Sequence, residues 1–155
     1  MKRLIFSFIC LAAYLLVSGC MTNTGAKKLP EASLGYQPKK IYDVDFNKAW
    51  KSVSRTLETE KIALITSNKA EGRMVTDNIQ GSTETSMGAT MTTRYSYVIL
   101  FKKISSNKTR INIICKFESM SSTIQWHDIG KSNPGRVAKL EAWLYERIEN
   151  SFYLV

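Results

Sequence analysis

Residues that carry reactive or metal-binding side chains are scarce in this chain. It has three cysteines, Cys10, Cys20 and Cys115, and a single histidine, His127. One histidine excludes a His-rich metal site, and the sequence contains no Cys-x-x-Cys pair, no Gly-rich phosphate loop and no serine or cysteine nucleophile pattern. We therefore expect no catalytic residue, no metal site and no cofactor.

Acid–base chemistry has few candidates. Asp77 with Glu71, or His127 with Asp128, could be posed as an acid and a base. Proximity in sequence does not supply the hydrogen-bond geometry that proton transfer needs. We expect these four side chains to be solvated surface groups and the protein not to be an enzyme.

The N-terminus has no apolar run long enough to span a bilayer stably as a helix. Lys2 and Arg3 precede an apolar stretch from Leu4 to Leu16, and small residues come next at Ser18 and Gly19. A charged start, a short apolar stretch and small residues are the order of a secretory signal. The alternatives are a signal with a chance cysteine behind it, or an uncleaved anchor.

The stretch Val17–Cys20 resembles the lipobox of bacterial lipoproteins. This resemblance implies cleavage between Gly19 and Cys20 and acylation of Cys20, including palmitate, which anchors the mature chain permanently because two or three acyl chains make escape negligible. No Asp comes directly after the cysteine, since residue 21 is Met21. In the enterobacterial sorting rule this favours the outer membrane, with the domain facing the periplasm.

Length and charge limit the organisation of the mature chain. Removing residues 1–19 from the 155-residue chain leaves 136 residues, which suits a lipidated flexible tether over residues 20–41 and one domain over residues 42–155. The mature chain has 20 basic and 13 acidic residues, spread along its length. We expect a solvated surface that could also touch anionic lipid, and no nucleic-acid partner. Cys115 alone would remain in the domain, so no intrachain disulfide can form.

The first half of the domain is predicted to form a helix and a hairpin. Asp45 is a suitable N-cap, and apolar residues come after it at helical spacing, which predicts a helix over Phe46–Glu60. The runs Ile62–Thr66 and Arg73–Asp77 are separated by Asn and Gly and predict a β-hairpin. Gly72 suits a turn position with positive φ.

Residues 80–93 have no periodic apolar face. We predict a long hairpin loop here, either a disordered excursion or a surface that orders on a partner. In the second case Met87 and Met91 would be adaptable apolar contacts.

Strict alternation marks the centre of the sheet. Tyr95–Lys102 and Ile111–Glu118 alternate apolar and other side chains, which predicts two strands with a buried face that includes Cys115. The outer face of the first of these strands is also rather apolar. Thr123–Trp126 is either a short edge strand or a loop that carries an aromatic side chain.

The chain is predicted to end in a second amphipathic helix. Asn133 is placed as its N-cap and Pro134 at its first position, and apolar residues recur at threes and fours to Phe152. Trp143 and Tyr145 flank this apolar stripe. If exposed, these two residues and Trp126 would be contacts for a partner, although partial packing in the core is the alternative.

The element order predicts an α+β fold, with an antiparallel sheet of about four strands flanked on one face by an N-terminal and a C-terminal helix. Trp50, the strand Ile62–Ile65 and the turn and strand Asn68–Asp77 resemble the helix-grip repeats of BamC-type outer-membrane lipoproteins. The resemblance implies the helix-grip fold and no particular functional residue.

Two functions fit these observations. One is a non-enzymatic accessory lipoprotein that docks on an outer-membrane biogenesis, transport or secretion assembly, with other envelope proteins as partners. The alternative is a periplasmic carrier of a small molecule or lipid, with a pocket between the sheet and the C-terminal helix, although bulky core residues would fill such a space.

Overall fold

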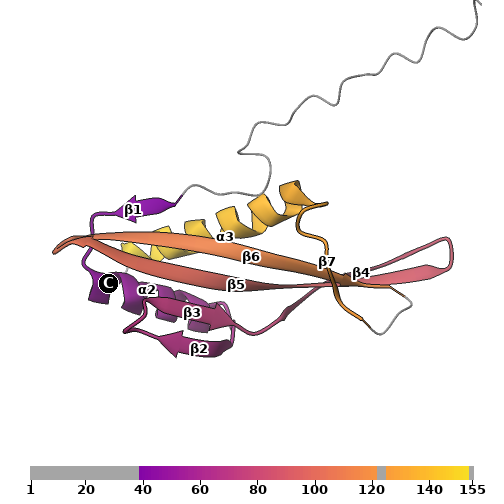
Figure 1. The fold of residues 1–155 in the computed structure, drawn as a ribbon, viewed down its shortest axis with the longest axis horizontal. Coiled ribbons are helices and arrows are strands. Elements are labelled where there is room, and N and C mark those ends of the chain that lie inside the picture. Colours follow the sequence, from indigo (N-terminus) through magenta and orange to yellow (C-terminus); the bar gives the residue numbers. More distant parts are fainter. Residues whose placement is uncertain (1–38, 122–124, 154–155) are drawn as a thin grey trace, which may run out of the picture.

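The computed structural model describes residues 39–121 and 125–153 (Figure 1). The predictions for the signal, for Gly19 and Cys20, for most of the tether, and for Thr123 and Ile124 lie outside the described residues. The elements, in chain order, are β1 (Lys40–Tyr42), α2 (Phe46–Thr59), β2 (Leu64–Asn68), β3 (Arg73–Thr76), β4 (Ile79–Ser86), β5 (Ala89–Ser105), β6 (Lys108–Met120), β7 (His127–Asp128) and α3 (Pro134–Phe152).

The α+β architecture is confirmed, and the sheet is larger than expected. Seven antiparallel strands replace the predicted four, in the order β1-β6-β5-β3-β2, with β4 beside β5 and β7 beside β6. The three additional strands are β1, β4 and β7. They are short or polar, and each is held by pairing with a long neighbour, so local apolar alternation did not reveal them.

The loop predicted over residues 80–93 is wrong, because this segment forms the β4–β5 hairpin. Its turn places Met87 and Gly88 at φ of 49° and 79°, the left-handed conformation at both central positions of a two-residue hairpin turn. Cross-strand threonine hydroxyls pair along the arm, at 3.4 Å between Thr83 and Thr92 and 3.2 Å between Thr85 and Thr90. Backbone and threonine pairing, rather than burial of an apolar face, holds this arm together.

Both helices cover the same face of the sheet, as expected. Figure 1 shows α2 and α3 on one side of β5 and β6, with nothing described on the other side. The inward residues of the two long strands meet the apolar stripes of the helices, and the buried residues of this core are Ala49, Val53, Leu57, Ile62, Met74, Tyr97, Ile99, Phe101, Ile111, Ile113, Cys115, Phe117, Val137, Leu144, Tyr145 and Ile148.

The N-terminal ends of both described helices can be compared with the capping residues that the sequence predicts. The Asp45 carboxylate accepts from the backbone N–H groups of Asn47 and Lys48, so the predicted N-cap of α2 is confirmed. The predicted N-cap position of α3, Asn133, and Pro134 at its start are confirmed, but the Asn133 side chain does not cap the helix: it donates to the Ile129 carbonyl at 3.0 Å. The preceding turn of residues 129–133 competes for this amide.

Gly72 has φ of +63°, as expected for its turn. A Cβ at this position would lie 2.5 Å from the Phe101 carbonyl oxygen, and the Phe101 N–H donates to the Gly72 carbonyl at 2.7 Å. A glycine is therefore required both by conformation and by the close approach of β5.

Candidate functional site

The acid–base candidates do not form a constellation. His127 and Asp128 are exposed on β7, and the Asp128 carboxylate accepts from the Gly130 N–H within its own turn. Among the described residues no hydrogen bond or ion pair joins His127 to Asp128, or Glu71 to Asp77. Within these residues there is also no cluster of three or more histidine, cysteine, aspartate or glutamate side chains that could hold a metal ion.

Cys115 lies buried on the inner face of β6. Burial, with a smaller contribution from the nearby Glu141 carboxylate, raises the pKa of this thiol to about 12. Because the thiolate is the nucleophilic form, the side chain is inert near neutral pH. Cys115 is a core residue, as expected.

Helix α3 satisfies the edge of β6 between the short strands β1 and β7. The Tyr145 hydroxyl accepts from the Ile113 N–H at 3.0 Å and donates to the Ile111 carbonyl at 3.3 Å. The Glu141 carboxylate accepts from the Cys115 N–H at 3.0 Å. Two helical side chains thus stand in for a neighbouring strand, and this edge offers no free backbone donors at residues 113 and 115.

Tyr145 is therefore corrected as a candidate partner contact, because it is fully buried. Trp143 is half-buried against the core, with the Arg147 guanidinium 5.8 Å from its ring centroid. Met87 is fully exposed at the tip of the β4–β5 arm, and Met91 is half-buried on the same arm. The structure does not bring these residues together into one surface.

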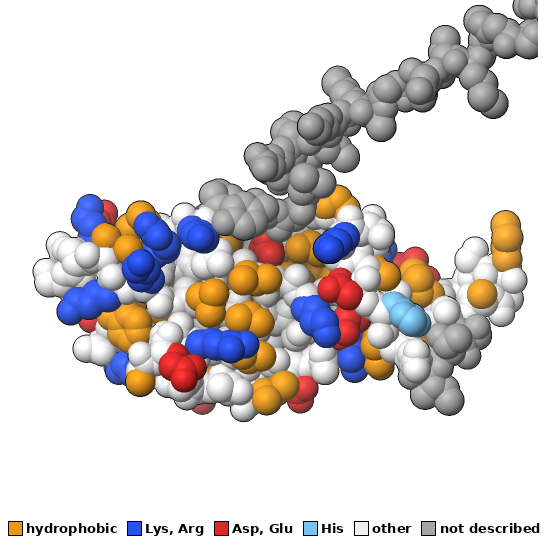
Figure 2. Space-filling view, viewed as in Figure 1, with side chains coloured by type: hydrophobic (Ala, Val, Ile, Leu, Met, Phe, Trp, Pro, Cys, Tyr) orange, Lys and Arg blue, Asp and Glu red, His pale blue; other side chains and the backbone are white. Residues whose placement is uncertain are grey.

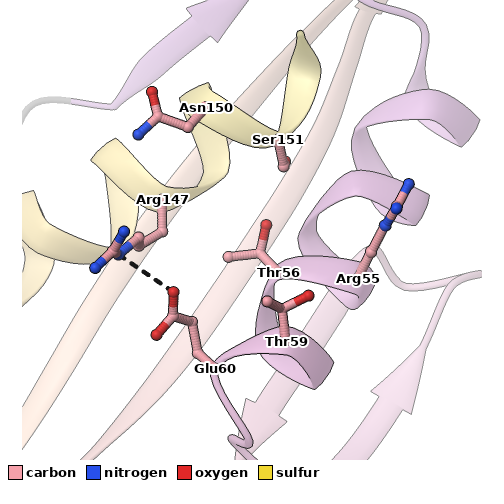
Figure 3. Close-up of a pocket in the computed structure, with 7 residues that line it drawn as sticks. All are labelled: Arg55, Thr56, Thr59, Glu60, Arg147, Asn150 and Ser151. Atoms are coloured by element: carbon pink, nitrogen blue, oxygen red, sulfur yellow. Dashed lines mark ion pairs between the residues drawn. The ribbon is translucent and has the colours of Figure 1, made fainter. Parts of the chain in front are cut away.

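A groove of about 290 Å³ separates the ends of the two helices (Figure 3). Its cationic side chains are Arg55 on α2 and Arg147 on α3, and Arg147 is paired with Glu60 at 3.2 Å. Figure 3 shows the two arginines on opposite sides of the groove and not converging. The groove therefore presents no site where both cations could hold one anion.

The face of the sheet turned away from the helices has an apolar centre. Three residues from adjacent strands form one row across it, Val75 on β3, Val98 on β5 and Ile114 on β6. Leu100 extends this row along β5. Ile114 is 46% exposed and Leu100 37% exposed, because nothing described packs above them. Figure 2 shows hydrophobic side chains gathered in the middle of the molecule, with blue Lys and Arg side chains around them.

Basic side chains surround this centre. The outward positions of β3, β5 and β6 nearest to it carry five cations, Arg73, Arg94, Lys102, Arg110 and Lys116, against the single carboxylate of Glu118. Arg73, Lys102 and Arg110 take part in no ion pair among the described residues, and Lys102 and Arg110 lie opposite each other on β5 and β6. We refer to the four apolar residues and these five cations as the open face.

At the end of the open face nearest β7, polar side chains are held in place by ion pairs. The Glu118 carboxylate is paired with Arg94 at 2.9 Å and with Lys116 at 2.7 Å, and the ring of Trp126 covers the Arg94 guanidinium at 4.1 Å. Burial alone would raise the pKa of Glu118, but the hydrogen bonds from Lys116 and Arg94 together hold it below its usual value. Trp126 is thus placed at the rim of the open face by a cation–π contact.

Comparisons with known proteins do not identify a family. No family profile matches the chain, and no curated protein matches it in sequence. Among solved structures, it is similar to a DUF4468 family protein from Bacteroides ovatus ATCC 8483, with 10% identity and a TM-score of 0.49 over 76% of this chain and 86% of that chain. This similarity is too distant to carry an argument about function.

Sequence reasoning found the elements of the open face but not the face as a site. The signal was present in the outward positions of β5, where Val98 and Leu100 are apolar although a solvated face would favour polar residues. Three of the five cations that flank them, Arg73, Arg110 and Lys116, come from β3 and β6 and became neighbours only through pairing. Neither described helix is long and apolar enough to cross a membrane.

Proposed function

We propose that this protein is a non-enzymatic, lipid-anchored accessory lipoprotein of the bacterial envelope, and that its domain docks through the open face on another envelope protein. The observation that supports the proposal is the row of Val75, Val98 and Ile114 at the centre of the sheet, in which the valines are half-buried and Ile114 is exposed. Apolar side chains that share one open face and are surrounded by polar residues are a common feature of interaction surfaces.

The charge around the row indicates the chemistry of the partner. The five cations of the open face outnumber the one carboxylate beside them, that of Glu118, and would attract a segment that carries apolar side chains along one side and carboxylates at its edges. Such a segment would bury Leu100 and Ile114 and pair with Arg73, Lys102 and Arg110. A second copy of this chain is a poor occupant, because two identical faces would oppose cation to cation.

A protein segment fits better than a lipid surface. Membrane-binding surfaces usually insert aromatic or long apolar side chains below the headgroups. The centre of the open face instead consists of Val, Leu and Ile side chains and contains no aromatic residue, and Trp126 lies against Arg94. An aliphatic strip with charged margins is suited to an extended or helical peptide.

The carrier alternative receives less support from the interior. The space between the sheet and the helices is occupied by large, fully buried side chains, of which Tyr97 and Tyr145 are the largest. The Tyr97 hydroxyl donates to the Leu140 carbonyl at 3.1 Å and so joins the sheet to α3 directly. A ligand between the layers at the centre of the sheet would have to displace this packing.

Site-specific photo-crosslinking in the native envelope tests the docking proposal. A photoreactive phenylalanine analogue at Val98 of the full chain should give one dominant protein adduct, whereas the same analogue at Ala142, exposed on α3, should not. The double substitution Lys102→Glu and Arg110→Glu should remove the adduct while the protein level stays the same. The crosslinked peptide of the partner should be rich in Asp or Glu.

Other results would contradict the proposal. Adducts with lipid alone at position 98 would indicate membrane binding, and an adduct with a second copy of this chain would indicate self-association. An equal yield at positions 98 and 142 would show that the open face has no preference. Anchoring is tested separately, because Cys20→Ser should abolish fatty-acid labelling without altering the fold.

A further inference from the structure

A pocket of about 230 Å³ lies where the first turns of α3 pass over β4, β5 and β6. It is on the helix-covered side of the sheet and is separate from the open face. Its floor is apolar and comes from three elements, with Tyr95 on β5, Phe117 on β6 and Leu140 on α3. Deeper between the same layers, the side chains of Tyr97 and Leu144 are fully buried.

Strand β4 forms one wall of the pocket. Gly81 forms part of its wall, and a Cβ at this position would lie 2.5 Å from the Thr93 hydroxyl, so the strand can approach β5 only without a side chain there. The pairing of β4 with β5 is irregular between Gln80 and Thr83. Further along β4, Glu84 is paired with Arg136 of α3 at 3.0 Å, which ties the arm to the helix at the margin of the pocket.

The rim of the pocket is cationic. Arg136 and Lys139 both line it from α3, and the Arg136 guanidinium lies 6.0 Å from the centroid of the Phe117 ring. Arg136 is engaged by Glu84, whereas Lys139 takes part in no ion pair among the described residues. The pocket thus combines an apolar floor with one ammonium group available to an anion.

The floor also carries a hydrogen-bond donor without a protein acceptor. The Tyr95 hydroxyl makes no hydrogen bond within the described residues, and its ring packs edge to face against Tyr97 at 5.7 Å. Burial raises the pKa of Tyr95, so its hydroxyl remains protonated near neutral pH. A ligand could therefore pair an anionic group with Lys139 and accept a hydrogen bond from Tyr95.

The geometry points to a binding site for an anionic acyl amphiphile, whose aliphatic chain lies over Tyr95, Phe117 and Leu140 and whose anionic head meets Lys139. The pocket is smaller than the roughly 300–1,000 Å³ typical of sites for drug-sized ligands. It would therefore hold a short chain, or only the end of a longer one. A free fatty acid and a phospholipid share this chemistry, and the proposal concerns the acyl chain and anion together.

Photoaffinity labelling of the full chain in native membranes tests this site. The probe is an octanoate with a diazirine on its chain, and the control probe has the same chain with a trimethylammonium head. The anionic probe should label peptides that contain Tyr95 or Leu140, as mapped by mass spectrometry, and the cationic probe should not. Excess octanoate should suppress the labelling if the site takes free fatty acids, and excess dihexanoyl phosphatidylglycerol should do so if it takes phospholipids.

A matched pair of lysine substitutions checks the role of charge. Lys139→Gln should reduce labelling of the Leu140 peptide about fivefold, as expected for the loss of one partly exposed charged hydrogen bond. Lys131→Gln, in the exposed turn before α3, should leave labelling unchanged. Both substitutions are at exposed positions, so the fold is retained.

The proposal would be overturned by equal labelling with both probes, by labelling that neither competitor suppresses, or by adducts confined to the open face. Competition by octanoate or by the phospholipid supports it and identifies the source of the ligand. Since the readout does not involve a partner protein, failure here leaves the docking proposal standing, and failure of docking leaves this site standing.

Discussion

The Tyr145 hydroxyl is predicted to stabilise the fold by satisfying the backbone of β6. The substitution Tyr145→Phe removes only the hydroxyl. The aromatic ring and its packing are retained, and so is the contact of the Lys40 ammonium, which lies 4.8 Å from the ring centroid. The substitution leaves the Ile113 N–H, which donates to the hydroxyl at 3.0 Å, without a partner in a fully buried position. The Ile111 carbonyl loses one of its contacts but remains beside Lys40 of β1.

Tyr145→Phe destabilises the folded state because it leaves the Ile113 N–H without an acceptor. A buried N–H that loses its partner costs about 1–3 kcal/mol, so the free energy of unfolding should fall by about that amount. Urea unfolding of the two proteins would measure the difference, with an unchanged dependence on urea concentration if the native surface is unaltered. Hydrogen exchange at the Ile113 amide should accelerate more than at its neighbours on β6.

Tyr153→Phe is the matched control. Tyr153 comes directly after α3 and is 89% exposed, so the loss of its hydroxyl should change stability by less than about 0.5 kcal/mol. The reasoning about the β6 edge would be refuted if Tyr145→Phe were as neutral as this control, or if the exchange of Ile113 did not change.

Three further predictions concern single positions. Gly72→Ala should lower the free energy of unfolding by about 3 kcal/mol or more in urea titrations, because an alanine would be strained at positive φ and would also clash with the Phe101 carbonyl. A loss below about 1 kcal/mol would contradict this account. Burial raises the pKa of the Cys115 thiol to about 12. This thiol should therefore resist iodoacetamide at pH 8 in the folded protein and react with it in urea. Rapid labelling of the native state would show that the thiol is accessible. The pKa of Glu118 is lowered in the folded state, so its contribution to stability is present above the ordinary glutamate pKa of 4.5 and is lost as the pH falls through the lower folded value. Unfolding free energies measured between pH 7 and pH 3 should therefore fall less steeply in Glu118→Gln than in the parent, and parallel curves would count against the pairing.

Most of the fold was predictable because its signals are local. The alternation of Ile111–Glu118 and the helical spacing after Asp45 determine which side chains face inward, and burial of these side chains is sufficient to select one face of the sheet. The conformation of Gly72 was also predictable, since the turn between two extended runs needs a positive φ.

The β4–β5 arm and the full width of the sheet were not predictable in this way. The arm has no apolar face, and its threonines pair only because β4 is held against the long strand β5. Strand β1 is three residues long and depends on the edge of β6 for its hydrogen bonds. Pairing between segments distant in sequence decided these elements, and propensity within the segment did not.

By itself, the sequence determined the fold class of the protein, the helices α2 and α3, the central strands and the scarcity of reactive side chains. Only the tertiary structure decided which surfaces those elements leave open. The tertiary structure turned Tyr145 inward to the β6 edge, placed Arg73 beside Leu100 and Arg110 beside Lys102, and left a pocket under Lys139. Each of these neighbourhoods joins elements that are remote in the chain. Apolar periodicity specifies which face of an element is buried, but the partner against which it lies depends on the register and order of the whole sheet.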